Sequence, residues 1–336
     1  MKVSIVVPVY NAAPFIERCA RSLFEQTMDD IEYVFVDDGS TDDGIAKLLS
    51  VLEEYPNRKP NVKIVHHAKN SGTAETRKDG CKSATGEYLI YIDSDDYADL
   101  TMAEKMYAKA KESDADMVVC DVCWCLETKK VELKSVLNGE GENGEKIKAD
   151  IINRRVTPGL WCKLIKSEIL KSKEFIWPVA SYAEDVVISV VASYYAKKIA
   201  YVEEQLYYYI YYSKSICNEK TEQRCLSNIE QCKRNLEVVI RFLKEKGIYD
   251  KYREGVYLNK FYVKKMAMPY MKERKFRKLW FRNYPEMNRI LFWGDDVYKS
   301  SYRQKIWMAA IWLGLYPKYK RRLQSKRFLP SPKWLC

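Results

Sequence analysis

The sequence has only two histidines, few glycines and prolines for its 336 residues, and no long apolar run. Low glycine and proline content excludes a collagen-like or low-complexity chain. The apolar part of residues 1–8 is too short for a signal peptide, and no run reaches the length of a transmembrane helix. The ten cysteines lack zinc-finger spacing. We therefore expect a globular, cytosolic protein whose thiols are reduced.

The charge of the chain is unevenly distributed. The whole sequence has a formal net charge of +11, whereas residues 251–336 contain 22 Lys and Arg against 5 Asp and Glu, a net of +17. The first 250 residues therefore carry 11 − 17 = −6. This asymmetry predicts that the basic C-terminal third meets a partner that the rest of the chain does not.

Apolar runs and helical patterns alternate over the first 93 residues, which favours a parallel α/β sheet covered by helices on both faces. The predicted strands are 3–9, 31–36, 62–66 and 86–93, with a further strand at 116–122. The predicted helices are 14–26, one ending near 55, 73–83, 98–114 and 220–246. Residues 126–150 are polar and are expected to form a surface excursion.

Two of the predicted strands end in clusters of aspartates. Asp37 and Asp38 follow one, and Asp93, Asp95 and Asp96 follow another. The carboxyl ends of parallel strands are where open α/β sheets bind ligands. Carboxylates this close repel one another, so the cluster favours a bound cation such as Mg²⁺ or Mn²⁺. The alternative is a solvated turn that caps the next helix.

Five short motifs stand at characteristic spacings: Val6–Asn11, Val34–Asp42, Asn70–Gly72, Arg77 and Ala84–Asp96. Together they closely resemble family 2 glycosyltransferases, the large inverting family with the GT-A fold. The resemblance covers residues 1 to about 215. It implies a Rossmann-like, mostly parallel sheet flanked by helices; beyond it, the helical pattern and charge of the remaining residues predict a helical, basic extension. The implied domains are 1–216, with a nucleotide-binding half (1–97) and an acceptor half (98–216), and 217–336.

The resemblance also implies roles for particular side chains. Asp95 would hold Mn²⁺ or Mg²⁺ through the DxD motif, and Asp96 would orient the turn. Glu17 and Arg77 could instead be solvated surface charges. The implied donor nucleotide contacts are Pro8, Tyr10, Glu17, Asp37 or Asp38, Asn70, Gly72, Arg77 and Asp93.

The acceptor half resembles the family at two segments. Trp161 and Lys163 lie in a Trp-x-Lys-Leu motif, where they would contact a sugar face and a phosphate. A core tryptophan and a solvated lysine are the alternatives. Glu184–Asp185 matches the pair in which, by resemblance, Asp185 is the catalytic base and Glu184 its neighbour. The acceptor hydroxyl must lose its proton as it attacks the sugar, so such a carboxylate is required.

The tyrosine-rich segment 206–216 departs from the family. Family members often have an Arg and a His here, whereas this chain has Ile210 and Tyr212. Both histidines lie upstream, at His66 and His67, so no downstream histidine can complete a metal site. Lys214 is a weak electrostatic substitute.

An apolar, tryptophan-containing segment, 306–316, precedes a Lys/Arg-rich segment, 318–327. This combination suits an anionic membrane interface. The alternative is a packed helix with a solvated basic tail; nucleic-acid binding is disfavoured because no nucleic-acid motif accompanies the charge.

The leading hypothesis is therefore an inverting glycosyltransferase of bacterial polysaccharide synthesis. It would use a nucleotide-sugar donor, expected to be UDP-linked, and a saccharide or polyprenyl-linked saccharide acceptor, peripherally on the inner face of the cytoplasmic membrane. A non-catalytic nucleotide-sugar-binding subunit is the main alternative. A nucleotidyltransferase is disfavoured because no Gly-rich, Arg/Lys-bearing loop follows the first strand.

Overall fold

The computed structural model describes residues 1–126, 129–131, 144–211, 221–299 and 301–313. The chain divides into two compact units. The first comprises Met1–Ile152 and Val156–Ser215, and the second comprises Asn153–Arg155 and Ile216–Cys336.

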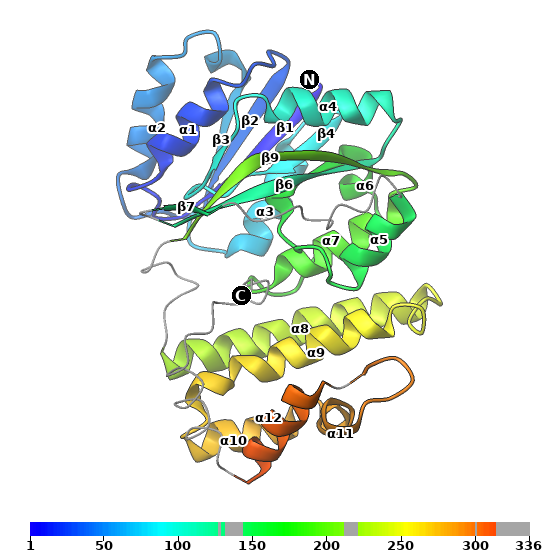
Figure 1. Cartoon of the computed structure of the whole chain (residues 1–336). Coiled ribbons are helices and arrows are strands. Elements are labelled where there is room, and N and C mark those ends of the chain that lie inside the picture. Colours follow the sequence, from blue (N-terminus) through cyan, green and yellow to red (C-terminus); the bar gives the residue numbers. More distant parts are fainter. Residues whose placement is uncertain (127–128, 132–143, 212–220, 300, 314–336) are drawn as a thin grey trace. The chain divides into compact units, whose positions relative to one another are not determined.

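The first unit is built on a nine-stranded sheet (Figure 1). Its strand order is β3-β2-β1-β4-β8-β6-β9-β5, and β7 pairs with β6. The strands are β1 (Val3–Val9), β2 (Ile31–Asp37), β3 (Val62–His66), β4 (Tyr88–Tyr91), β5 (Tyr97–Ala98), β6 (Met117–Leu126), β7 (Lys129–Val131), β8 (Lys163–Lys166) and β9 (Ile199–Tyr211).

The first four strands are parallel, as the alternating pattern predicts. In their register Val9 lies beside Asp37, and Asp37 lies beside His66. The segments that leave β1, β2 and β3 therefore meet at one edge of the sheet. The turn after β4 joins the same edge, because β4 is parallel to β1.

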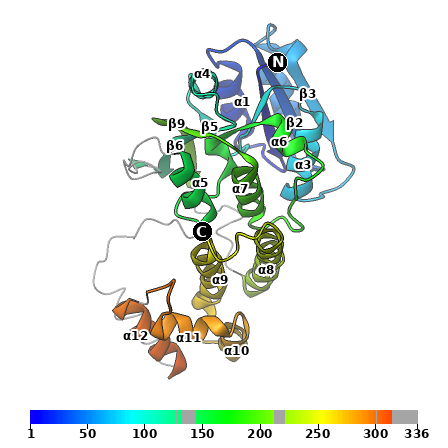
Figure 2. The ribbon, with the colours of Figure 1, turned by 90° about the vertical axis from the view of Figure 1, so that its right-hand side faces the viewer.

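Helices cover both faces of this sheet. α1 packs with α2 on one face, whereas α3 lies on the other, in a layer that α6 and α7 continue (Figure 2). Right-handed crossovers between parallel strands require this arrangement, because the chain moves outward from β1 to β3 and then returns to β4. The helices are α1 (Ile16–Phe24), α2 (Gly44–Glu53), α3 (Thr73–Ser83), α4 (Met102–Glu112), α5 (Gly144–Ile152), α6 (Ser167–Lys171) and α7 (Glu184–Tyr195).

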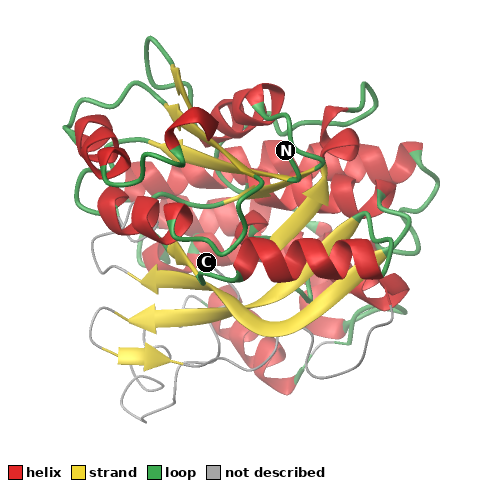
Figure 3. Cartoon of the chain, turned by 90° about the horizontal axis from the view of Figure 1, so that it is seen from above, coloured by secondary structure: helices red, strands yellow, loops and turns green. Residues whose placement is uncertain are grey.

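The second half of the sheet is mixed. β8 is antiparallel to both β4 and β6, while the long strands β6 and β9 run parallel to each other. Figure 3 shows these long strands curving across the unit. Their register shifts on either side of Asp121, and such irregularities bend a strand. β9 thereby extends to β5, next to the acidic turn.

Two predicted boundaries need correction. The helix expected from 98 begins at Met102, because Tyr97–Ala98 pairs with β9 and forms β5 instead. The excursion expected over 126–150 is ordered at both ends, as β7 and α5. Its middle part, 132–143, lies outside the described residues.

The second unit is helical in its described residues. It comprises α8 (Glu222–Glu245), α9 (Arg253–Met266), α10 (Arg274–Arg282), α11 (Glu286–Trp293) and α12 (Tyr302–Trp312). An apolar cluster that includes Trp280, Met287 and Leu291 forms its core. Among the described residues, no helix combines the length and apolar character needed to cross a bilayer.

Lys264 of α9 is fully buried in this unit. Its ammonium donates hydrogen bonds to the carbonyl oxygens of Trp280 and Asn283, which closes the C-terminal end of α10. Carbonyls at a helix end lack partners within the helix and carry partial negative charge, so a lysine there satisfies both. Lys264 therefore joins α9 to α10.

Candidate active site

The acidic turn that follows β4 presents its three carboxylates in different surroundings. Asp96 is 1% exposed and accepts hydrogen bonds from the Tyr207 hydroxyl at 2.6 Å and the Ile210 amide at 2.7 Å. Asp93 and Asp95 are only partly buried. Asp96 thus fixes the turn to β9, and the other two carboxylates are left facing the sheet edge.

Asp95 has an electrostatic environment that suits a cation. Burial and the nearby charge of Asp93 raise the pKa of Asp95 to about 6. Arg18 of α1 opposes this shift, and its guanidinium donates to the main-chain oxygen of Asp95 at 2.7 Å. A positive ion beside the turn would relieve the repulsion between Asp93 and Asp95.

The donor set around the turn fits a metal that is only partly held by protein. Within the described part of the chain, no group of three or more His, Cys, Asp or Glu side chains could hold a metal ion. Asp93 is engaged with Arg77 and Asp96 with β9, which leaves Asp95 as the candidate ligand. Mg²⁺ is commonly held by one or two carboxylates together with substrate phosphates and water. The residues therefore fit an ion that binds with a diphosphate.

Arg77 connects the acidic turn to the start of α7. It is 5% exposed, and its guanidinium donates to Asp93 at 2.8 Å and to Glu184 at 2.7 Å. Its Nε is buried without a hydrogen-bond partner. Although burial disfavours its charge, the carboxylates raise the pKa of Arg77 further above its ordinary value. Arg77 is therefore a buried, permanently charged bridge, and the alternative of a solvated surface charge is excluded.

Glu184 and Asp185 begin α7 in unequal environments. Glu184 is 8% exposed, whereas Asp185 is half-buried. Burial raises the pKa of Glu184, and the charge of Arg77 opposes the shift. The preceding Ala183 has a left-handed backbone (φ 62°), a conformation that costs energy for a residue other than glycine. Of the pair, Asp185 is the more accessible carboxylate.

Asp37 and Asp38 use their carboxylates to shape neighbouring loops. Asp38 accepts hydrogen bonds from the amides of Ser71 at 2.7 Å and Gly72 at 2.8 Å, and its Oδ1 lies 2.8 Å from Nδ1 of His67. Asp37 accepts from the Ser40 amide at 2.9 Å. Burial would raise the pKa of Asp37, but its hydrogen bonds, including those from Ser40, outweigh burial and lower it. Both carboxylates thus hold the loops that border the edge.

The loop at Asn70–Gly72 brings the donor half of the unit against the acceptor half. Gly72 has a φ of +87°, which favours glycine, and a Cβ there would lie 2.2 Å from Oγ of Ser181. Ser181 stands just before Glu184 and Asp185. Asn70 is exposed at the outer side of the same loop. A side chain at position 72 would therefore push the two halves apart.

Three predicted nucleotide contacts lie on or near α1. Tyr10 is 41% exposed after β1, Pro8 is half-buried, and Glu17 is exposed on α1. Glu17 lines an open cavity of about 820 Å³ together with Arg18, Tyr97 and other residues of α1 and β5. These side chains are accessible from solvent, in contrast to Arg77.

Trp161 and Lys163 are part of the core. Trp161 is 6% exposed and stacks on Tyr207, with ring centroids 4.8 Å apart. Lys163 is fully buried, and its ammonium donates to the carbonyl oxygens of Thr157 at 2.7 Å and Gly159 at 2.6 Å. This geometry does not support the predicted phosphate contact of Lys163. Lys163 instead holds the loop that carries Trp161 in place through these two hydrogen bonds. Both residues are buried and support the site without being exposed in it.

Two residues of the site were not identified from the sequence. Tyr207 contacts both Asp96 and Trp161, yet the tyrosine-rich run gave no reason to choose it over its neighbours. His67 holds Asp38, and here a signal was present. In a parallel pair the carboxyl ends of the two strands lie side by side. The His66–His67 pair at the end of β3 therefore lies next to the Asp37–Asp38 pair at the end of β2.

Comparison with known proteins agrees with this geometry. Residues 4–148 match the family model of Glycosyl transferase family 2. Over these residues the chain is similar to family 2 glycosyltransferases. The matched region contains the ends of β1 to β4, the acidic turn and Arg77.

A curated glycosyltransferase is similar to this chain in sequence. A poly(ribitol-phosphate) beta-glucosyltransferase of Bacillus spizizenii is 34% identical over 220 residues, which cover 62% of this chain and 32% of that protein. This chain therefore spans about a third of that relative's length.

Solved structures show the fold. Staphylococcus aureus TarS 1–349 in complex with UDP-GlcNAc aligns with a TM-score of 0.58 at 18% identity, covering 99% of this chain and 95% of that chain. A mannosyltransferase from Pyrobaculum calidifontis, in complex with GDP-Man and Mn²⁺, aligns with a TM-score of 0.52 at 15% identity, covering 97% and 88%. The predicted GT-A fold is confirmed.

Proposed function

We propose that this chain transfers a sugar from a nucleotide-sugar donor, a UDP-sugar, to a saccharide acceptor with inversion at the anomeric carbon. The observation that carries the proposal is the Arg77 bridge, which joins Asp93 of the acidic turn to Glu184 of the Glu184–Asp185 pair. An in-line displacement needs the leaving group and the base on opposite sides of one sugar. Arg77 links Asp93, which would stand on the side of the leaving group, to the Glu184–Asp185 pair, which would stand on the side of the base.

On the donor side, Asp93 would contact the ribose, and the accessible Tyr10 and Pro8 would contact the base. Glu17, Asn70, Gly72 and Asp37 or Asp38 would border the nucleotide. The Mn²⁺ complex of the Pyrobaculum relative supports metal use in this fold. A divalent ion at Asp95 would supply charge neutralisation for the departing diphosphate.

On the acceptor side, Asp185 would accept the proton of the attacking hydroxyl. It is half-buried and lies beside Glu184, whose carboxylate Arg77 holds in place. Trp161 would support the acceptor side through its stack on Tyr207.

Release of nucleoside diphosphate from a panel of UDP-sugars, with Mn²⁺ and with Mg²⁺, tests the proposal. Asp185→Ala is expected to lose about 10²–10⁴-fold in transfer rate, the range for removal of a general base. Asp95→Ala is expected to lose metal-dependent turnover. Glu112→Ala, which removes an exposed carboxylate at the end of α4, serves as the control. Full activity of both site variants would contradict these roles.

We further propose that the acceptor is a lipid-linked saccharide of cell-surface polysaccharide synthesis, met at the inner face of the cytoplasmic membrane. The poly(ribitol-phosphate) beta-glucosyltransferase relative supports a polymeric acceptor. Transfer to an extracted lipid-linked acceptor, compared with a free oligosaccharide, measures this preference. Equal rates on both would argue against a lipid-linked acceptor.

A nucleotide-sugar-binding subunit without transfer activity is the second candidate. Ile210 replaces an arginine or histidine that family members often have, and position 212 lies outside the described residues. Calorimetry would distinguish the two: nucleotide binding without turnover on any membrane acceptor supports the binding subunit.

A further inference from the structure

The second unit exposes large apolar side chains within residues 293–313. Trp293 is 71% exposed, Tyr302 and Trp312 are each 79% exposed, and Leu313 is 66% exposed. These are the four highest exposures of a large apolar side chain in the part of the chain that the structure describes. Their clustering within 293–313 distinguishes them from isolated surface apolar residues, which need no explanation.

Helix α12 carries apolar residues on both of its sides. Met308 and Ile311 pack into the core of the unit, whereas Tyr302, Trp312 and Leu313 remain exposed. Tyr302 and Leu313, which directly follows α12, are eleven residues apart, about three turns of an α-helix, so they share one side; Trp312 lies roughly 80° from Tyr302 around the helix axis. A helix whose solvent side is also apolar is expected to have a partner on that side.

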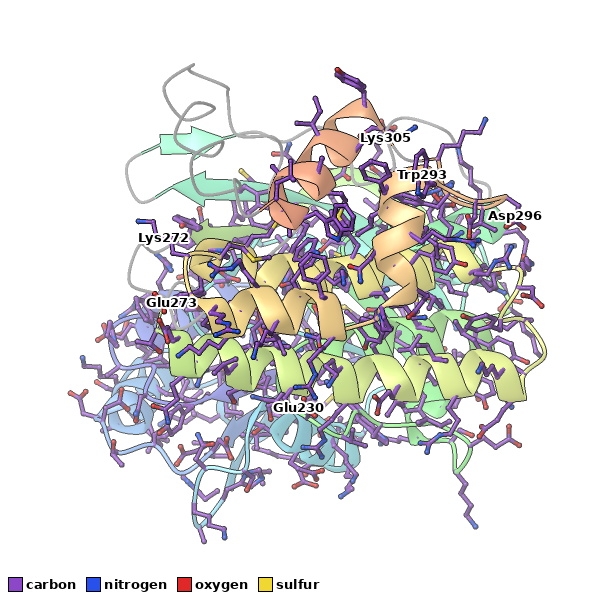
Figure 4. All side chains as sticks on the ribbon, turned by 90° about the horizontal axis from the view of Figure 1, so that it is seen from below. Glu230, Lys272, Glu273, Trp293, Asp296 and Lys305 are labelled. Atoms are coloured by element: carbon purple, nitrogen blue, oxygen red, sulfur yellow. The ribbon has the colours of Figure 1, made fainter. Side chains whose placement is uncertain are left out.

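Helix α10 of the same unit has a cationic side. Phe276 and Trp280 are buried, while Arg274, Lys278 and Arg282 are exposed at intervals of four residues. Residues four apart stack on one side of a helix. α10, α11 and α12 lie together on one side of the α8–α9 pair, and α11 packs against α12; Figure 4 labels Trp293 on α11 and Lys305 on α12.

The acidic residues of this region do not neutralise these cations. Residues 251–336 contain five carboxylate side chains, and three of them form ion pairs elsewhere. Glu254 pairs with Arg155 at 2.6 Å, Glu286 with Lys260 at 2.7 Å, and Asp296 with Arg253. The net positive charge of the region is therefore available to an anionic partner.

We propose that α10, α11 and α12 form a docking face for an anionic lipid bilayer. The docking face consists of Trp293, Tyr302, Trp312 and Leu313 as its apolar part and Arg274, Lys278 and Arg282 as its cationic part. Tryptophan and tyrosine favour the headgroup level of a bilayer, and Lys and Arg are attracted to anionic lipids. Charge complementarity selects a lipid surface over a second, equally basic copy of this chain. The proposal is independent of the transfer chemistry.

Cosedimentation of the full chain with vesicles tests the docking face. We expect binding to vesicles that contain phosphatidylglycerol, and much weaker binding to pure phosphatidylcholine. Each cation near an anionic surface is worth roughly fivefold in affinity, so Arg274→Gln/Lys278→Gln/Arg282→Gln is expected to lose on the order of a hundredfold. The variant Trp293→Ser/Tyr302→Ser/Trp312→Ser is expected to lose binding at both low and high salt, because salt does not screen the apolar contribution of these side chains.

Matched controls lie on α8. Arg234→Gln/Arg241→Gln/Lys244→Gln removes the same charge, and Leu226→Ser removes a partly exposed apolar side chain; both are expected to bind like the unaltered chain. Retained release of nucleoside diphosphate and unchanged circular dichroism would show that the docking variants are folded and that the first unit is intact.

Three results would overturn the proposal. One is unaltered vesicle binding by both docking variants. A second is loss of binding only when Lys318, Lys320, Arg321 and Arg322 are changed to Gln, which would assign lipid binding to that segment. The third is a concentration-dependent dimer, seen by sedimentation, that the aromatic variant dissociates.

Discussion

Arg77→Met removes the cation that joins the two halves of the site. The guanidinium is 5% exposed and lies 2.7–2.8 Å from two carboxylates that are 107 and 16 residues away in sequence. Loss of one partner from a buried ion pair typically costs about 3–5 kcal/mol, because the remaining charge stays buried. The side chain of Asp93 is 28% exposed and can turn to water. We therefore expect the lower end of that range, about 3 kcal/mol.

The pH dependence of this loss has a definite sign. Burial and the charge of Asp185 raise the pKa of Glu184, and Arg77 is the group that lowers it. With Arg77 in place the pKa of Glu184 is already raised to about 7, so loss of Arg77 keeps the proton on Glu184 in the folded state to still higher pH. Stability from such a group is lost as the pH rises above the ordinary glutamate pKa of about 4.3 and through the raised value. Both proteins lose this contribution up to about pH 7, and Arg77→Met continues to lose it above that pH, so its destabilisation is expected to grow above about pH 7.

The assay measures urea unfolding and donor turnover from pH 5 to pH 8, about the range where the fold is expected to be most stable. Turnover is expected to fall about a hundredfold, because a misplaced base and acidic turn lose their alignment. Lys78→Met is the control, since it removes a partly exposed cation from the same helix that pairs with Glu75 at 3.6 Å. If Arg77→Met unfolds and turns over like Lys78→Met, Arg77 does not organise the site.

Four further changes have defined outcomes. Gly72→Ala is expected to weaken donor binding, measured by calorimetry, because its Cβ would meet Ser181. Tyr207→Phe leaves Asp96 short of one hydrogen bond and is expected to cost about 1–3 kcal/mol in urea unfolding. Lys163→Met frees two buried carbonyls and is expected to lower stability without a change in KM for the donor. Burial lowers the pKa of Lys264 to about 7, so the folded chain binds fewer protons than the unfolded one between there and the ordinary value of 10.5. Its contribution to stability therefore rises with pH in that window, by up to about 1.4 kcal/mol per unit, and Lys264→Met is expected to lose this slope.

Local patterns were sufficient to predict the parallel half of the sheet. β1, β2, β3 and α3 begin and end within a residue of the predicted ranges. A parallel strand that is buried on both faces appears in the sequence as a continuous apolar run, and here each run is bounded by turn residues. The aspartates at the strand ends were located for the same reason, because parallel strands all end at one edge.

The second half of the sheet was less predictable, because long-range pairing decides its elements. β5 is two residues long and exists only because β9 bends across to pair with it. No local pattern distinguishes such a strand from the start of a helix, which is why the helix was expected from 98. The same bend brings Tyr207 to Asp96.

The sequence by itself determined which residue types stand at the sheet edge, the family motifs and the basic C-terminal third. Each is a matter of composition and spacing along the chain. Only the tertiary structure decided what the charged side chains touch. It placed Arg77 between Asp93 and Glu184, buried Lys163 against two carbonyls, and assigned Asp96 to β9. A long charged side chain can reach solvent, a carbonyl or a distant carboxylate from the same backbone position. Which of these it meets depends on segments that lie far away in the sequence.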